Sequence, residues 1–420
     1  MGFQQGLSGL AASSASLDVI GNNIANANTY GAKASRAEFA DLYANAIGGT
    51  SNAIGIGTKV AAVAQQFTQG TISTTGNPLD VAINGGGFFE VSSTSGAVSY
   101  TRNGEFKTDN SGYIVNDQGQ RLMGYPANAA GTIIPGTATA LQMPTAGLTP
   151  AVTTSISMEM NLDATSAVTV PASGPPIAFA DPTTYNNATS QTVYDAKGQQ
   201  VALTYYFQKA STDTWNVYVA ANGTPIATDA SGNPAPSTTI TFPTNGGTPT
   251  APVGTVALDI PSVTNGVGAT TVPITGVALD VSGATQYGST FGVTALSQDG
   301  YAAGSLTGVT FGSTGIITAT YSNGQTKPAG QLEIATFQNP QGLEPTGGNA
   351  WAQTAASGGP IVGVPGSGNL GVLQAGALED SNVDLTGELV NMITAQRDYQ
   401  ANAQTIKTED QIMQTIVNLR

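Results

Sequence analysis

The sequence predicts an α+β multidomain chain with paired N- and C-terminal coiled-coil-like helices, a split inner β domain and an inserted outer β domain. Three observations support this prediction. Apolar residues recur at helical spacing at both ends of the chain, whereas the stretch between the ends alternates at the period of β-strands. In the middle the composition shifts toward Thr, Pro, Gly and Ala, as expected for an inserted domain. The length of 420 residues also exceeds what one hydrophobic core usually supports.

The first helix is predicted from a seam of residues spaced alternately four and three apart. This seam consists of Phe3, Leu7, Leu10, Ser14, Leu17, Gly21 and Ile24. Such spacing is typical of a helix that packs against other helices. The Asn-rich stretch that follows, ending with Gly31, favours termination of the helix.

A second helix with the same spacing is predicted at the other end of the chain. Its seam consists of Leu385, Leu389, Met392, Gln396, Tyr399, Ala403, Ile406, Asp410, Met413 and Val417. Asn382 or Asp384 can cap its N-terminus, because the side-chain oxygen of Asn or Asp accepts a hydrogen bond from the first backbone N–H groups. Glu388 stands in the first turn, where the helix dipole favours a carboxylate.

The seams leave two alternatives for what covers them. A single amphipathic helix is usually docked on its own domain. Polar or flexible residues interrupt both seams here, so each helix is marginal alone and outside partners are expected to supply stability. We therefore predict a subunit interface at the apolar seam positions Phe3, Leu7, Leu10, Leu17, Ile24, Leu385, Leu389, Met392, Tyr399, Ile406 and Met413.

Alternating apolar residues predict the strands of the inner β domain. One strand through Leu79 and Ile83 and a second through Phe88 and Val91 flank three glycines, which predicts a hairpin with a tight turn. Later in the chain, strands at 316–321 and 332–337 are predicted on either side of an Asn323-Gly324 turn.

The outer domain is predicted between the two halves of the inner one. Within it, apolar and other residues alternate in two runs, at Val201, Leu203, Tyr205 and Phe207 and at Trp215, Val217 and Val219. The two runs predict paired strands of a hairpin with one buried face. The predicted domain ranges are 1–30 and 381–420 for the terminal helices, 31–70 and 365–380 for the extended connector, 71–145 and 285–364 for the inner β domain, and 146–284 for the outer β domain.

Composition excludes several classes of function. The net charge of −14, with twelve Lys and Arg residues, disfavours nucleic acid and anionic membranes as partners. Without Cys or His the chain cannot form Cys/His zinc sites, disulfides or His-based triads. The sequence has no run of about 18 apolar residues, so no membrane span is predicted. Its start has no basic n-region, so no cleaved signal is predicted.

Two formal patterns are interpreted as structural. Gly366, Gly368 and Gly371 match a dinucleotide fingerprint but lack the strand before and the helix after it, so we interpret them as a flexible turn. The outer-domain acids, which are Asp163, Asp181, Asp195, Asp213 and Asp229, are interpreted as solvated loop residues. We therefore predict no catalytic, cofactor-binding or metal site, and no enzyme.

Two segments at the ends of the chain resemble a known family. NNIANANTYGAKASRAEFADLY near the start and SNVDLTGELVNMITAQRDYQANAQTIKTEDQIMQTIVNLR at the end resemble the terminal motifs of the bacterial flagellar rod and hook family. GNPLDVAINGGGFFEV and YTRNGEFKTDNSGYIVNDQGQRLMGYP are similar to its inner β domain. SQDGYAAGSLTGVTFGSTGIITATYSNGQTKPAGQLEIATFQNPQGL and TVYDAKGQQVALTYYFQKASTDTWNVYV resemble its hook branch. One departure is Ala32, where the family commonly has an aromatic residue.

The resemblance implies a non-enzymatic subunit that polymerises head to tail into the flagellar hook, a flexible extracellular tube that acts as a universal joint and transmits torque from rod to filament. It implies self-association as a homopolymer, and as further partners the distal rod, the hook cap, the hook-filament junction proteins and the flagellar type III export apparatus. Two alternatives remain open: a distal rod subunit of the flagellum, and a secreted β-rich adhesin or glycan-binding protein.

Overall fold

The computed structural model describes residues 2–42, 55–171, 176–266 and 268–418. The rest of the predicted division, which is residues 43–54 of the connector, 172–175 and 267 of the outer domain and 1, 419 and 420 at the ends, lies outside the described residues. The chain divides into two compact units. Unit 1 comprises 1–145, 307–320 and 326–420, and unit 2 comprises 146–306 and 321–325.

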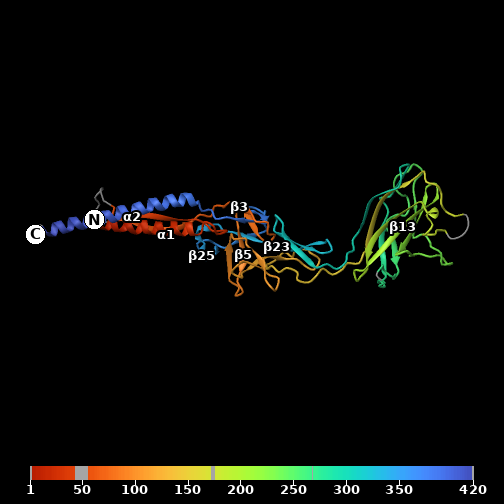
Figure 1. The fold of residues 1–420 in the computed structure, drawn as a ribbon, viewed down its shortest axis with the longest axis horizontal. Coiled ribbons are helices and arrows are strands. Elements are labelled where there is room, and N and C mark those ends of the chain that lie inside the picture. The colour runs from red at the N-terminus through yellow and green to blue at the C-terminus, as the bar shows by residue number, and fades with distance from the viewer. Residues whose placement is uncertain (1, 43–54, 172–175, 267, 419–420) are drawn as a thin grey trace. The chain divides into compact units, whose positions relative to one another are not determined.

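The two long helices of unit 1 are α1 (Gly2–Ala25) and α2 (Leu385–Asn418). They lie side by side although they stand at opposite ends of the chain (Figure 1). Helices at both termini are therefore confirmed. Of the two predicted caps, Asp384 is the one used: its Oδ1 accepts the N–H of Thr386 at 3.1 Å. Asn382 instead accepts the N–H of Ala34 at 2.7 Å and thereby ties the start of α2 to the chain after α1.

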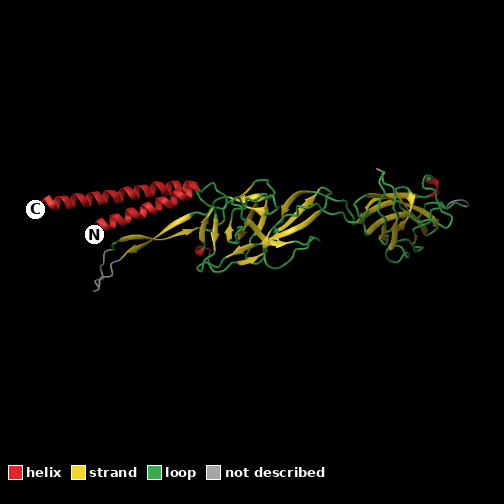
Figure 2. Cartoon of the chain, turned by 90° about the horizontal axis from the view of Figure 1, so that it is seen from below, coloured by secondary structure: helices red, strands yellow, loops and turns green. Residues whose placement is uncertain are grey.

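Unit 1 also contains a two-stranded β-ribbon next to the helices. Its strands, β1 (Ser35–Leu42) and β2 (Gly57–Gln65), pair antiparallel, with Ser35 opposite Gln65 and Leu42 opposite Gly57 (Figure 2). Residues 35–42 and 57–65 of the predicted extended connector are thus paired in a ribbon, whereas 372–375 and 377–379 of its second part pair with residues 81–84 and 72–74 respectively. The ribbon contacts α1, where the hydroxyl of Ser8 accepts the N–H of Thr58 at 3.3 Å.

The β part of unit 1 is built around one large, mostly antiparallel sheet and two short two-stranded pairs. Its strands are β3 (Ile72–Thr74), β4 (Val81–Asn84), β5 (Phe88–Ser92), β6 (Val98–Thr101), β7 (Lys107–Thr108), β8 (Ile114–Val115), β9 (Arg121–Pro126), β10 (Thr139–Ala140), β21 (Leu306–Phe311), β22 (Ile316–Tyr321), β23 (Thr326–Leu332), β24 (Ile334–Thr336), β25 (Glu344–Gly347), β26 (Ala350–Ala352), β27 (Ile361–Gly363), β28 (Val372–Ala375) and β29 (Ala377–Glu379). A 3₁₀ turn spans Pro340–Gly342.

Strand β5 shows how the large sheet is packed. It pairs with β6, β9 and β24 and sends alternate side chains to two clusters. Phe89 and Val91 belong to one cluster, with Leu122 and Ile334, whereas Phe88 belongs to a second, aromatic cluster. Both faces of β5 are therefore covered, which explains why its apolar residues form a run.

The hairpin predicted around the three glycines is wrong. Strand β4 pairs with β28, and β5 pairs within the large sheet. Gly85 and Gly87 have φ values of 114° and 123°, so the glycines carry the chain from one sheet to another. The turn at Gly324 is confirmed, but the strand after it begins at Thr326 and is interrupted at Glu333.

Unit 2 contains two sheets around one core. The first holds β11 (Ser155–Asp163), β17 (Val256–Ile260), β18 (Ile274–Asp280), β19 (Thr285–Tyr287) and β20 (Gly292–Gln298). The second holds β12 (Asn187–Tyr194), β13 (Gln200–Ser211), β14 (Thr214–Ala221), β15 (Thr224–Pro225) and β16 (Thr238–Thr241), and a 3₁₀ turn spans Pro182–Thr184. Inward residues of both sheets form a single hydrophobic cluster.

Two predictions about this region have different outcomes. The hairpin of β13 and β14 is confirmed, with Tyr205 opposite Val219 and the alternating apolar residues buried. The predicted return to the inner domain at residue 285 is wrong, because β19 and β20 both pair with β11 and complete the sheet of unit 2.

Candidate functional site: the exposed faces of the terminal helices

Helices α1 and α2 run antiparallel and meet through small and polar residues. Gly6 of α1 is buried against Ile406, since a Cβ atom added to this glycine would lie 3.0 Å from Ile406 Cγ1. In the same way, a Cβ atom added to Gly9 would lie 2.7 Å from Oδ1 of Asn402. The glycines therefore allow the two backbones to approach closely at this end of the pair.

At the opposite end of α1, one buried amide joins three elements. Asn23 donates to Glu388 Oε1 of α2 at 2.9 Å and to the backbone carbonyl of Ser35 at 2.8 Å, and its Oδ1 accepts the Ser35 N–H at 2.8 Å. Asn23 is 3% exposed, so these bonds are shielded from water and fix α1, α2 and β1 relative to one another.

Because the helix contact is small and polar, several predicted seam residues stay exposed among the described residues. The exposed residues among the predicted interface positions, with the exposed fraction of each, are Phe3 (51%), Leu7 (52%), Leu385 (43%), Leu389 (47%), Tyr399 (38%) and Met413 (62%), and the seam residue Val417 is 71% exposed. The seam residues Leu10, Leu17, Ile24, Met392 and Ile406 are half-buried, and Ile406 is the one that abuts Gly6. Some predicted interface residues are thus exposed to solvent, and the others are partly covered.

Sequence reasoning missed further exposed apolar residues near this seam. On α2 they are Val390, Ile393 and Ile412, and on the ribbon they are Phe39, Val60 and Val63. The α2 residues lie outside the spacing of three and four that defined the seam, and the ribbon residues belong to a segment predicted to be an extended connector. The exposed apolar surface is therefore wider than one helix stripe.

A buried ion cluster fixes the base of the helix pair. Glu379, which ends β29, pairs with Lys33 Nζ at 2.5 Å and with the Arg102 guanidinium at 2.9 Å, and the three side chains are 0–5% exposed. Burial lowers the pKa of Lys33 and that of Arg102, and the Glu379 carboxylate opposes both shifts. One carboxylate from the C-terminal segment thus holds two cations from the N-terminal part of the chain.

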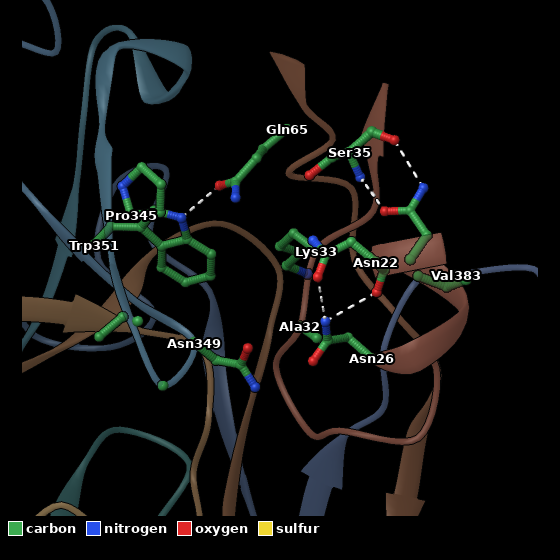
Figure 3. Close-up of a pocket in the computed structure, with 14 residues that line it drawn as sticks. Asn22, Asn26, Ala32, Lys33, Ser35, Gln65, Pro345, Asn349, Trp351 and Val383 are labelled. Atoms are coloured by element: carbon green, nitrogen blue, oxygen red, sulfur yellow. Dashed lines mark hydrogen bonds between the residues drawn. The ribbon is translucent and has the colours of Figure 1, made fainter. Parts of the chain in front are cut away.

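The cavity beside this cluster has a volume of about 240 Å³ and is lined by Ala32, Trp351, Asn26 and Asn349 among others (Figure 3). Gln65 from β2 accepts the Trp351 indole N–H at 2.5 Å and closes one side. Ala32 is the position at which the sequence departs from the family pattern, and its small side chain leaves this space open.

Among residues 2–42, 55–171, 176–266 and 268–418, no cluster of three or more acidic side chains is suited to hold a metal ion. None of the described helices is both long and apolar enough for a membrane span. One acid departs from expectation: Asp195, predicted to be solvated, is buried because its carboxylate accepts the N–H groups of Lys197, Gln199 and Val272, each at 2.8 Å.

Four family models match the chain along most of its length. They are described as "Flagella basal body rod protein" (residues 3–33), "Flagellar hook protein FlgE/F/G D1 domain" (82–174), "Flagellar basal body protein FlaE D2 domain" (161–301) and "Flagellar basal body rod FlgEFG protein C-terminal" (374–419). The terminal helices and both β units are thus those of the flagellar rod and hook class.

Similar proteins narrow this class. The "Flagellar hook protein FlgE" of Salmonella typhimurium is 42% identical over 427 residues, and that of Escherichia coli is 40% identical over 423, with 100% of both chains covered in each case. The fold resembles the crystal structure of the Helicobacter pylori flagellar hook protein FlgE2, with a TM-score of 0.53 at 15% identity over 73% of this chain and 100% of that one. The chain belongs to the flagellar hook protein family.

Proposed function

We propose that this chain is a structural subunit that polymerises head to tail into the flagellar hook, a flexible tube that works as a universal joint between rod and filament. The observation that carries the proposal is the apolar surface left on α1 and α2 after they have packed together, including Phe3, Leu7 and Leu389. Several large apolar side chains left exposed along one helix pair favour a site of protein association.

The way in which copies of this chain would associate follows from the kind of contact they make. A contact between two different surfaces of the same chain, repeated without closing into a ring, generates an open helical polymer. The exposed seam residues of α1 and α2 would pack against the helices of neighbouring copies in a coiled-coil-like arrangement and form the inner wall of the tube. The subunit interface is accordingly assigned to the seam positions, and Val390 and Ile393 extend it.

The proposed domain roles follow the same logic. The β part of unit 1 would act as a split inner domain below the helices, and unit 2 as the inserted outer domain. Unit 2 has its own hydrophobic cluster and its own two sheets, which supports an independent body carried by the assembling part. Its scarcity of Lys and Arg leaves few long side chains that anchor fixed interfaces, which suits outer contacts that slide as a bent tube rotates.

Location and partners are proposed on the basis of family membership. The subunit would reside in the extracellular hook of the flagellar basal body, after export through the flagellar type III apparatus. It would contact the distal rod at one end of the hook, and the hook cap and the hook-filament junction proteins at the other.

The test of this proposal is removal of α2. A chain lacking residues 384–420 should keep both β units folded but form no tubes, because half of the proposed inner wall is absent. Tryptophan fluorescence reports folding, and electron microscopy of concentrated samples reports assembly, with the full chain as the matched control. Tubes formed by the shortened chain would refute the proposed role of the helices.

A further inference from the structure

Two buried glutamates lie together at a junction of strands in unit 1, away from the helices. The ladder between β5 and β24 places Phe89 opposite Ile334 and Phe88 opposite Ala335, so the next position on each strand sets Glu90 beside Glu333. Glu333 stands at the break between β23 and β24, where the chain stops pairing with β9 and starts pairing with β5.

Both carboxylates point to the same face of the sheet. Leu332 and Ile334, the neighbours of Glu333, belong to the cluster that also contains Phe89 and Val91, the neighbours of Glu90. Side chains alternate between the faces of a strand, so Glu90 and Glu333 project to the opposite, aromatic face. They are 9% and 2% exposed, which removes most of the water that would solvate two negative charges.

The hydrogen bonds around the pair are incomplete. Glu90 Oε2 is buried without a hydrogen-bond partner among the described residues. The Tyr125 side chain of β9 favours the charged form of Glu333, whereas Tyr100 of β6 stands opposite Glu90 in the ladder. A buried carboxylate oxygen without a donor is costly when it is charged and far less costly when the group is protonated.

The cations on the neighbouring strands are engaged elsewhere. Arg121 of β9 holds its guanidinium over the Tyr113 ring, 3.9 Å from the centroid. Arg102, which follows β6, pairs with Glu379, and Lys327 of β23 donates to the Ala129 carbonyl. The charged and titratable groups that face Glu90 from β6, β9 and the break between β23 and β24 are therefore Tyr100, Tyr125 and Glu333.

We propose that Glu90 and Glu333 hold one proton between them at neutral pH, so that unit 1 loses stability as the pH rises. Like charges in a shared buried site cannot both ionise without a large penalty, and the proton is retained by the pair as a whole. The inference does not depend on assembly, because it concerns the folding of the free chain.

The direction of the pH effect follows from the two states of Glu90. Burial, reinforced by repulsion from Glu333, raises the pKa of Glu90 from its ordinary value of 4.5 to about 7. Burial also raises the pKa of Glu333, against the opposing effect of Tyr125. Between about pH 4.5 and 7 the unfolded chain releases a proton that the folded chain keeps, so stability falls across this window and levels off above it.

The experiment compares Glu90→Gln with the parent chain, since Gln has the shape of the protonated acid. The chain has two tryptophans, and Trp351 lies in the aromatic cluster on the same face as the pair. In a Trp215→Phe background, Trp351 fluorescence during urea unfolding reports unit 1. The folded-to-unfolded ratio of Glu90→Gln relative to its parent should grow by roughly 10- to 100-fold from pH 5 to pH 8.

Two further variants keep the test decisive. Glu333→Gln removes the repulsion and should show the same growing advantage even if Glu90→Gln fails to fold. Glu344→Gln, at an exposed position on β25 of the same sheet, should show none. A change below about threefold between pH 5 and pH 8 in both Glu90→Gln and Glu333→Gln would overturn the proposal, as would the same advantage in Glu344→Gln.

Discussion

The core of unit 2 and the helix pair of unit 1 differ in whether their apolar residues are buried. On β13 and β14, Phe207 and Trp215 are fully buried and belong to one cluster with residues of the first sheet of unit 2. On α1 and α2, Gly9, Ser13 and Asn402 form the contact, while residues such as Leu389 face solvent. The core cluster of unit 2 is buried within that unit, whereas the helix pair leaves many of its apolar residues exposed.

This difference predicts where the two regions obtain their stability. Burial of apolar area is the main favourable term in folding, so unit 2 should be stable as a free body. The helix pair gains little from its glycine and asparagine contact and depends on the hydrogen bonds and ion pairs at its base.

The largest effect is expected from Phe207→Ala in β13. Phe207 is fully buried and its ring centroid lies 5.7 Å from that of Phe291, so truncation leaves a cavity in the core of unit 2. Unfolding of unit 2 should be favoured by about 3–5 kcal/mol, measured by Trp215 fluorescence in urea. Thr204→Ala, at a half-buried position on the same strand, is the control. Equal losses in the two variants would contradict an apolar core at this site.

A somewhat smaller effect is expected from Glu379→Gln at the base of the helices. This change leaves the Lys33 and Arg102 cations buried without their carboxylate, which costs about 3 kcal/mol in comparable sites. Unfolding of unit 1, followed by Trp351 fluorescence, should shift accordingly. Glu38→Gln is the control, because its pair with Arg36 is exposed and worth less than about 1 kcal/mol. Unchanged stability in Glu379→Gln would show that the cluster does not hold the segments together.

The sequence predicted these two regions to different extents for a physical reason. The β13 and β14 hairpin follows from local alternation, because its partners are separated by a short turn. The pairing of Glu379 with Lys33, or of β4 with β28, joins residues from opposite ends of the chain, and periodicity carries no information about such partners. For the same reason β19 and β20 were placed in the wrong domain, since their partner β11 lies far before them.

Prediction of the candidate site from the sequence was limited for the same reason. Helical spacing located the seam, including Leu389 and Met413, but it could not show that glycines would form the contact between α1 and α2. That contact decides which apolar residues stay exposed. Val390 and Ile393 were missed because exposure of a residue outside the seam depends on the position of the partner helix, which the spacing does not reveal.

The smallest effect on the free chain is expected from Leu389→Gln. Leu389 is 47% exposed, Gln has a similar helix propensity and its aliphatic stem keeps part of the contact, so the unfolding free energy should change by about 1 kcal/mol or less. Assembly should respond much more strongly. Burying the exposed half of a leucine against a neighbouring copy is worth about 1–1.5 kcal/mol, so its loss should raise the critical concentration for polymerisation roughly tenfold.

Sedimentation of polymer across a concentration series measures this critical concentration. Val390→Gln distinguishes a narrow interface from a wide one, because Val390 is 58% exposed but lies outside the predicted seam. If neighbouring copies surround α2, both variants should weaken assembly; if they cover the seam alone, only Leu389→Gln should. Gln404→Ala, at an exposed polar position of α2, is the matched control for both. Normal polymerisation of Leu389→Gln together with Val390→Gln would mean that the open apolar surface of α2 is not where the copies meet.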